Sequence, residues 1–505
     1  MKNGFRKLVW LCMPFFAAFW FAGCDQLGVN GPVPVPAESV EILDDGLCDG
    51  LYLDEGRTVE IRARVLPEGA VGYELAWTVD DESIATVDPH GMVKGISGGV
   101  VTVTVTLYVD GDEIDSDRIE LTVVPQETLV DPIDPYLLFD ALRGLAVRTG
   151  GWADYYNGGL GIAYANPGAP IVICDESYPD PGDKLDAFIA ALAITEPTFI
   201  IVSGDIDLSR GRITPGSMPP ENVPMNDRRF DVNADTTIIG INDARLMFGG
   251  LRMDGRPGGG RSPIGNVIIR NIAIWDSVDY GLGLDSLLIR GAMGVWIDHV
   301  RFTSGNRRNA NVSRPDPDRW HDDTLNIREG MVTVSWSEFY NLDRTLLSGS
   351  GDGETDREAR RVTLHHNFFH NVRQRVPRTR GTQMHMYSNY FYRIGLYIMG
   401  PGVNSAFVVQ NNLFDSGGTR GIVDWSFPNA DAVVWSSGNV AGVGIAGVTN
   451  GEISTREADR VKPWEPGDFY QYTLTADVQG LRTLLPGRAG PTLETIADFL
   501  AGLGD

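Results

Sequence analysis

Cysteine is scarce in this chain, which has four among 505 residues. Cys12 and Cys24 lie in the first 24 residues, so only Cys48 and Cys174 remain in the body of the protein, far apart in sequence. Two distant cysteines form neither a disulfide framework nor a cysteine-ligated metal cluster, and we expect both to be unpaired apolar side chains. Histidine is also sparse, at seven residues, and no pair at zinc-ligand spacing has a third ligand nearby, which argues against a zinc site.

Positive charge is the second deficit, because 42 Lys and Arg face 67 Asp and Glu, which gives a formal net charge of -25. Such a chain lacks the basic surface that displaces counterions from a phosphate backbone, which argues against nucleic acid as a partner. One stretch departs from this trend, since "RQRVPRTRG" at 373–381 contains Arg373, Arg375, Arg378 and Arg380. Screening limits surface charges to a range of about 8 Å at physiological salt, so this cluster can bind an anionic ligand despite the net charge.

The first 24 residues have the features of an export signal, with a basic start, an apolar stretch and small residues before Cys24. The apolar stretch is too short and one-sided for a membrane-spanning helix. The sequence "FAGC" resembles the lipobox of bacterial lipoproteins, although Phe21 stands where Leu is usual. The resemblance implies that 1–24 is a lipoprotein signal peptide and that a lipid on Cys24 anchors an exported protein to the cell envelope, facing the periplasm or the cell surface. An ordinary cleaved signal, giving a secreted protein, is the alternative.

A small β-rich unit at 38–124 follows a Pro-containing linker at 25–37. Apolar residues alternate between turn signals about every ten residues, a pattern that predicts a β-sandwich. Trp77 and the run from Ala85 to Gly95, "ATVDPHGMVKG", resemble the bacterial Ig-like group 2 domain. That resemblance implies a spacer or weak adhesion module. A second linker, at 125–137, separates it from the rest of the chain.

The remaining unit, 138–505, begins with a helix-like run at 184–195 and a strand from Pro197. From Asp235 onward, apolar–x–apolar blocks recur, each followed by a small polar residue. That polar site falls, at steps of 30, 22 and 23 residues, on Ser337, Asn367, Asn389 and Asn412. Short coils of this length predict a right-handed parallel β-helix in which Asn side chains of successive coils bond one another. The predicted fold class is therefore all-β, a parallel β-helix preceded by a small Ig-like sandwich.

Several blocks of the β-helix, including "VWIDHVRF" and "RRVTLHHNFFHNVRQRVPRTRG", resemble polysaccharide lyase family 1, the pectate lyases. The most specific element is R-x-P-x-x-R, formed here by Arg375, Pro377 and Arg380. The resemblance implies cleavage of polygalacturonate by β-elimination, in which C5–H of a uronic acid is removed and the glycosidic oxygen at C4 leaves. Removing that proton creates a dianionic enolate-like state, so the site needs cations on the carboxylate and a base at C5.

The same resemblance implies residue roles. It makes Arg375 the base and Arg380 a ligand of the substrate carboxylate, and it places Arg344 where the family commonly has a substrate-binding lysine. Arginine suits carboxylates because its planar fork meets both oxygens. A basic Arg375 requires that other cations, such as neighbouring arginines and calcium, disfavour its charged form, because arginine is normally protonated.

A Ca²⁺ site is also implied, in which acidic residues of adjacent coils hold the ion and the ion bridges to the uronate carboxylates. Asp285 and Asp322 fall on ligand positions, and Asn326 occupies another, where it offers a carbonyl oxygen without charge. Gly283 stands where a further carboxylate is expected. Strand alternation predicts that Asp323 turns away from Asp322. We therefore expect a site with two carboxylates and weaker calcium binding.

Asp298 and His299, in the "WIDH" block, are interpreted as structural residues. Two alternatives to a calcium-assisted pectate lyase stay open. A calcium-independent pectin lyase acting on esterified pectin is favoured by the depleted acidic site, and a non-catalytic pectin-binding adhesin is favoured by the Ig-like unit. The expected partner is an anionic polysaccharide, the expected membrane contact is the lipid on Cys24, and the expected state is a monomer.

Overall fold

The computed structural model describes residues 36–42, 51–54, 58–67, 70–124, 133–158, 160–213, 228–255, 264–278, 283–305, 321–454, 456–493 and 495–501. The predicted signal peptide with Cys24, and Cys48, lie outside these residues. Cys174 is unpaired and half-buried, as expected. Within the described ranges, every helix is too short or too polar to cross a membrane.

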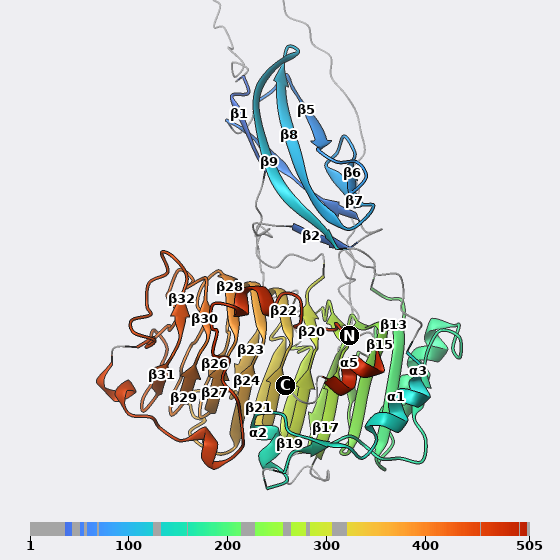
Figure 1. Cartoon of the computed structure of the whole chain (residues 1–505), viewed down its shortest axis with the longest axis vertical. Coiled ribbons are helices and arrows are strands. Elements are labelled where there is room, and N and C mark those ends of the chain that lie inside the picture. Colours follow the sequence, from blue (N-terminus) through green and yellow to red (C-terminus); the bar gives the residue numbers. More distant parts are fainter. Residues whose placement is uncertain are drawn as a thin grey trace, which may run out of the picture.

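In its described residues, the N-terminal unit consists of strands without a helix (Figure 1). Its sheets run in the orders β2-β9-β8-β5, β3-β7-β6 and β1-β4. Along β8, Val101, Val103, Val105 and Leu107 are buried, whereas the alternating threonines are half-buried, which is the pattern of a strand with one core-facing side. The Ig-like sandwich prediction is confirmed. The strands are β1 Ser39–Ile42, β2 Leu51–Asp54, β3 Thr58–Glu60, β4 Ala63–Leu66, β5 Tyr73–Val79, β6 Ala85–Val87, β7 Met92–Gly95, β8 Gly99–Val109 and β9 Asp112–Val124.

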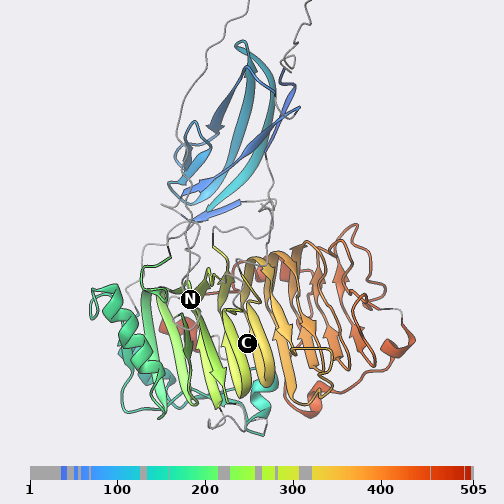
Figure 2. The same ribbon diagram turned by 180° about the vertical axis from the view of Figure 1, so that it is seen from behind.

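The second unit is a parallel β-helix, as predicted, in which 21 strands form one continuous sheet (Figures 1 and 2). These strands are β12 Ile171–Ile173, β13 Thr198–Asp207, β14 Arg229–Asp231, β15 Thr236–Met247, β16 Gly250–Asp254, β17 Ile264–Arg270, β18 Ala273–Trp275, β19 Leu287–Asp298, β20 Arg301–Thr303, β21 Leu325–Ser335, β22 Glu338–Arg344, β23 Leu346–Ser348, β24 Arg360–His365, β25 Phe368–Gln374, β26 Arg378–Thr379, β27 Gln383–Tyr387, β28 Tyr390–Ile394, β29 Ala406–Gln410, β30 Leu413–Phe414, β31 Val433–Ser437 and β32 Val440–Ala441.

Each coil contributes strands to three faces of the β-helix, and the strand pairing shows which strand lies on which face. The second half of β21 pairs with β24 on the first face, β22 pairs with β25 on the second, and the first half of β21 pairs with β23 on the third. The chain therefore turns one corner between the first and second faces and another between the second and third.

Short helices and one extra strand pair surround the β-helix: α1 Pro135–Leu142, β10 Ala146–Val147, α2 Trp152–Tyr155, β11 Ile162–Ala163, α3 Pro181–Leu192, the 3₁₀ helices η3 Glu457–Arg460 and η4 Pro466–Asp468, α4 Leu481–Leu484 and α5 Ile496–Ala501. The predicted helix at 184–195 is α3, which begins earlier because Asp180 accepts hydrogen bonds from the backbone N–H groups of Gly182 and Asp183. Its apolar side packs beside β13 and closes the first coil.

An asparagine ladder runs along the corner between the first and second faces. The backbone N–H of Ser337 donates to Asn367 Oδ1 at 2.9 Å, and the same bond links Asn367 to Asn389 at 3.0 Å, Asn389 to Asn412 at 2.9 Å and Asn412 to Asn439 at 2.9 Å. The residue before each ladder position has a positive φ, which makes the turn. The predicted register is confirmed and extends by one coil.

Inside the coils, a stack of phenylalanines follows the same axis. All five rings are fully buried, and neighbouring ring centroids lie 4.9, 4.7, 5.1 and 4.9 Å apart. Burying each side chain contributes about 1.5–3 kcal/mol, so the stack is a large part of the stability of the β-helix. Its members are Phe302, Phe339, Phe369, Phe391 and Phe414.

Candidate active site

The corner between the second and third faces collects the charged residues singled out from the sequence. Asp285 and Asp322 lie just before β19 and β21, Arg344 ends β22, and Arg375 follows β25. Because β19, β21 and β23 pair in parallel register, these residues occupy neighbouring positions on successive coils although they are far apart in the chain.

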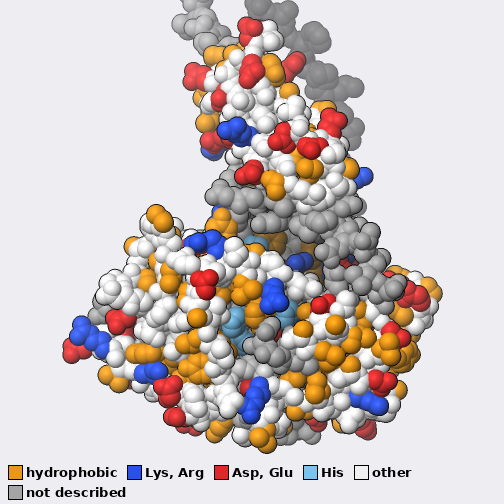
Figure 3. Space-filling model, in the orientation of Figure 1, with side chains coloured by type: hydrophobic (Ala, Val, Ile, Leu, Met, Phe, Trp, Pro, Cys, Tyr) orange, Lys and Arg blue, Asp and Glu red, His pale blue; other side chains and the backbone are white. Residues whose placement is uncertain are grey.

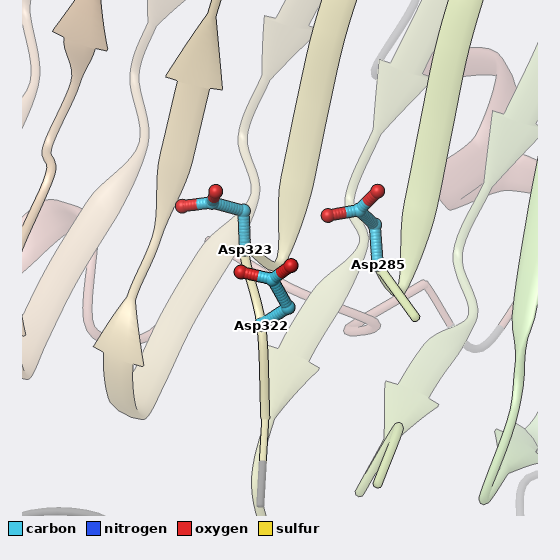
Figure 4. A group of neighbouring side chains, drawn as sticks. All are labelled: Asp285, Asp322 and Asp323. Atoms are coloured by element: carbon cyan, nitrogen blue, oxygen red, sulfur yellow. The ribbon is translucent and has the colours of Figure 1, made fainter. Parts of the chain in front are cut away.

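Three carboxylates meet at this corner, from Asp285, Asp322 and Asp323 (Figure 4). One oxygen of each lies within 4.8 Å of the others. Burial, together with the charges of Asp323 and Asp322, raises the pKa of Asp285 well above its ordinary value. Burial also raises the pKa of Asp323 to about 6, although the charge of Arg375 opposes this. The three carboxylates repel one another, so the cluster is suited to binding a cation.

The expectation that Asp323 turns away from Asp322 is wrong. Both residues precede the start of β21 at Leu325, so the alternation of a pleated strand does not apply to them. Asp323 is 2% exposed and points into the cluster, whereas Asp322 is half-buried. The cluster therefore has three carboxylates, not the predicted two. Gly283 lies beside it, because a Cβ built there is 3.9 Å from Asp322 Oδ2 with nothing else inside 4 Å.

Asn326 completes the oxygen-rich lining. Its Nδ2 lies 3.2 Å from both carboxylate oxygens of Asp285, and its Oδ1 is buried without a hydrogen-bond partner. A buried carbonyl oxygen without a partner is costly unless something binds it. Three carboxylates and an amide oxygen are the hard ligands that Ca²⁺ prefers, so the residues present fit that ion.

Arg375 is in direct contact with the cluster. Its Nη1 donates to Asp323 Oδ1 at 2.8 Å and lies 2.7 Å from Oδ2. Burial disfavours the charged guanidinium, but the carboxylate of Asp323 outweighs it, and the pKa of Arg375 lies above its ordinary value. A single nitrogen makes both contacts, so the remaining N–H groups point elsewhere. The backbone at Arg375 has φ 60°, and the Val376–Pro377 peptide that follows is cis.

The other two predicted substrate ligands have different surroundings. Arg344 Nη1 donates to Asp322 Oδ1 at 3.1 Å, so Arg344 joins the cluster. Arg380 does not contact it; its Nε donates to Asp352 Oδ1 at 2.8 Å. Arg380 therefore extends the basic surface beyond Arg375 instead of joining the acidic centre.

The two remaining arginines of the "RQRVPRTRG" stretch have structural contacts. Arg373 Nη1 donates to buried Asp343 at 2.8 Å. Arg378 is buried, donates to the carbonyl oxygens of Thr379 and Gly400 at 2.7 and 2.9 Å, and lies 4.1 Å from the ring centroid of Phe427. Burial lowers the pKa of Arg378 to about 10.

Arg328 belongs to the site and was not identified from the sequence. It lies two residues after Asn326 on β21, on the same outward side. Its Nε is buried without a hydrogen-bond partner, and its charge opposes the rise in the pKa of Asp285. The outward alternation from Asn326 was the signal that could have found it.

Polar groups on other faces have structural contacts. Asp298 is buried among Arg270 at 2.7 Å, His299 at 2.8 Å and Ser335 at 2.6 Å, in keeping with a structural role. Figure 3 shows histidine side chains near the centre of one face of the β-helix. Where side chains are described, the acidic cluster is the one group of three His, Cys, Asp or Glu side chains close enough to share a metal ion.

Comparisons with known proteins agree with this architecture. A family model described as "Pectate lyase" matches residues 128–459, and one described as "Bacterial Ig-like domain (group 2)" matches 50–113. "Pectate lyase E" of Dickeya chrysanthemi is 27% identical over 377 residues, 68% of this chain and 89% of the relative. "Pectate trisaccharide-lyase" of Thermotoga maritima is 34% identical over 180 residues, 34% of this chain and 42% of the relative. The solved structure "Pectate lyase bound to hexasaccharide" has the same fold, with TM-score 0.54 and 22% identity over 70% of this chain and 99% of that chain.

Proposed function

This chain belongs to the pectate lyase family and is a polysaccharide lyase, and from that premise we propose that it cleaves polygalacturonate by β-elimination at the corner of Arg344, Arg375 and the three aspartates. The observation that carries this proposal is the contact of Arg375 with Asp323 inside a largely buried group of carboxylates. It sets a candidate base beside a candidate cation site.

The reaction assigns each side chain a task. Arg375 first gives one proton to water, and the neutral side chain then takes the C5 proton through a nitrogen that Asp323 does not hold. The electrons of that C–H bond form the C4–C5 double bond, and the C4 oxygen leaves and is protonated by water. Arg344 and Arg380 bind substrate carboxylates, and Arg328 supplies a further cation beside Asp285. Charge that develops on the reacting carboxylate is stabilised by these fixed cations.

Arg375 must lose positive charge to act as a base, and Asp323 opposes this by raising its pKa. Asp285, Asp322, Asp323 and Asn326 would hold a Ca²⁺, whose charge would stabilise the enolate-like state and disfavour protonated Arg375. Three carboxylates around this position also weaken the case for a calcium-independent pectin lyase, which rested on a depleted site.

An ultraviolet assay of the unsaturated product tests the reaction. With polygalacturonate and Ca²⁺ the absorbance should rise, and a chelator should stop it. Faster, chelator-insensitive turnover of esterified pectin would favour the pectin lyase instead.

Arg375→Ala tests the base. We expect a loss of at least about 10²-fold in kcat, because general bases contribute 10²–10⁴-fold, while polymer binding persists. Arg373→Ala, a matched change at a residue that contacts Asp343, should keep the wild-type rate. Polymer binding without product under every metal condition would support the adhesin reading.

We also propose that the enzyme is exported and held at the cell envelope by a lipid on Cys24, with the Ig-like unit as a spacer. The support is the signal-like sequence and its "FAGC" end. Mass spectrometry of the membrane fraction should find lipidated Cys24 as the mature N-terminus, and Cys24→Ala should abolish it. Mature protein that starts elsewhere without lipid would contradict the anchor.

A further inference from the structure

Asp323 contacts the candidate base and also belongs to the candidate cation site. Both of its oxygens lie within 2.8 Å of Arg375 Nη1, and one oxygen also lies within 4.8 Å of ligand oxygens of Asp285 and Asp322. Asp322 is shared in a similar way, because it bonds Arg344, whereas Asp285 faces the amide of Asn326. Asp323 is the member of the three that bonds the proposed base.

The two partners of Asp323 compete for its oxygens. A cation at the cluster takes carboxylate oxygens at about 2.3–2.6 Å, and an oxygen of Asp323 that binds the ion weakens its bond to the guanidinium. The guanidinium and the ion also repel each other, because both are positive and the surroundings are buried. Asp323 is 2% exposed, so water cannot easily replace whichever partner it leaves.

We propose that Arg375 and Ca²⁺ compete for Asp323, so that calcium binding draws this carboxylate off Arg375 and the hold of Arg375 weakens calcium binding. Asp323 thereby takes the place of the carboxylate that Gly283 lacks. The inference rests on the proposed function for the role of Arg375 as base: the base loses its carboxylate partner as the cation site fills. Linkage makes the effect reciprocal, so it is measurable from the calcium side alone.

Calcium titration calorimetry of the full chain, without substrate, tests the competition. Arg375→Met should raise calcium affinity about fivefold or more, the lower range of a typical coupling between two sites. Asp323→Asn should lower it. In the Asp323→Asn background, the gain from Arg375→Met should shrink to that of Arg373→Met, which removes the same charge from a residue that contacts Asp343.

The double variant separates competition from simple charge repulsion. An equal gain with and without Asp323 would overturn the proposal, as would no gain from Arg375→Met or no calcium binding by the wild type. Should Asp323→Asn fail to fold, judged by circular dichroism, Asp323→Ser replaces it, because it also removes the carboxylate; the gain from Arg375→Met should shrink there as well, and an undiminished gain would overturn the proposal. Failure of the lyase proposal looks different, because calcium competition can persist in a protein without turnover, and turnover can persist without competition.

Discussion

The Asp285→Asn variant should bind calcium more weakly than the wild type and should be more stable in its absence. Asp285 is 1% exposed and shares the corner with two carboxylates whose oxygens lie within 4.8 Å. At that distance, and with an effective dielectric constant near 20, two full charges repel by about 3.5 kcal/mol. Arg344 and Arg375 offset part of this, and the raised pKa of Asp285 has burial and the same repulsion as its causes. We therefore expect the variant to gain about 1–3 kcal/mol in free energy of unfolding in chelator.

Urea unfolding followed by tryptophan fluorescence, in chelator and in Ca²⁺, measures both effects. The wild type should be stabilised by Ca²⁺ and Asp285→Asn much less, because binding to the folded state alone raises stability. Asp205→Asn is the matched control: Asp205 bonds Arg245 at 2.6 and 2.7 Å, so its loss should cost about 0–1 kcal/mol under both conditions. If Asp285→Asn proves less stable than the wild type in chelator, the arginines outweigh the repulsion and the reasoning fails.

Two further predictions concern the β-helix itself. Asn389→Ala should cost about 3–5 kcal/mol in urea unfolding, because it strips hydrogen bonds from the N–H and Nδ2 of Asn367 and from the Leu364 carbonyl, all buried; a cost below 1 kcal/mol would contradict a working ladder. Burial lowers the pKa of His365 to about 4 and of His385 to about 3. The unfolded chain therefore binds these protons first, and stability should be lost as pH falls from about 6.5 toward 4. His385→Gln should flatten that decline in urea midpoints, and an unchanged slope would refute the assignment.

The repeat could be predicted because each coil has the same pattern of apolar and polar residues. Inward apolar residues and one small polar residue per coil fix the register, so the sequence alone places Asn367, Asn389 and Asn412 on one corner. The arginine motif could also be recognised from the sequence, because Arg375 and Pro377 lie two residues apart. Local patterns of this kind predict structure where backbone geometry is regular.

Asp323 and Arg328 show where that reasoning ends. Asp323 lies before the strand, where no fixed alternation dictates side-chain direction, so only the folded corner brings it to Asp285 and Arg375. Arg328 did follow the alternation but lacked a motif to single it out among 42 lysines and arginines. The pairing of Arg380 with Asp352 depends on a loop whose course periodicity cannot give.

The β-helix tolerates a self-repelling corner because its stability is generated elsewhere. The asparagine ladder runs along a different corner, and the phenylalanine stack lies inside the coils. Leu287, Leu325 and Leu346, which follow the charged positions, are fully buried and keep the coils stacked whichever residues precede them. The coils therefore hold the three carboxylates of Asp285, Asp322 and Asp323 at one corner although these charges repel one another.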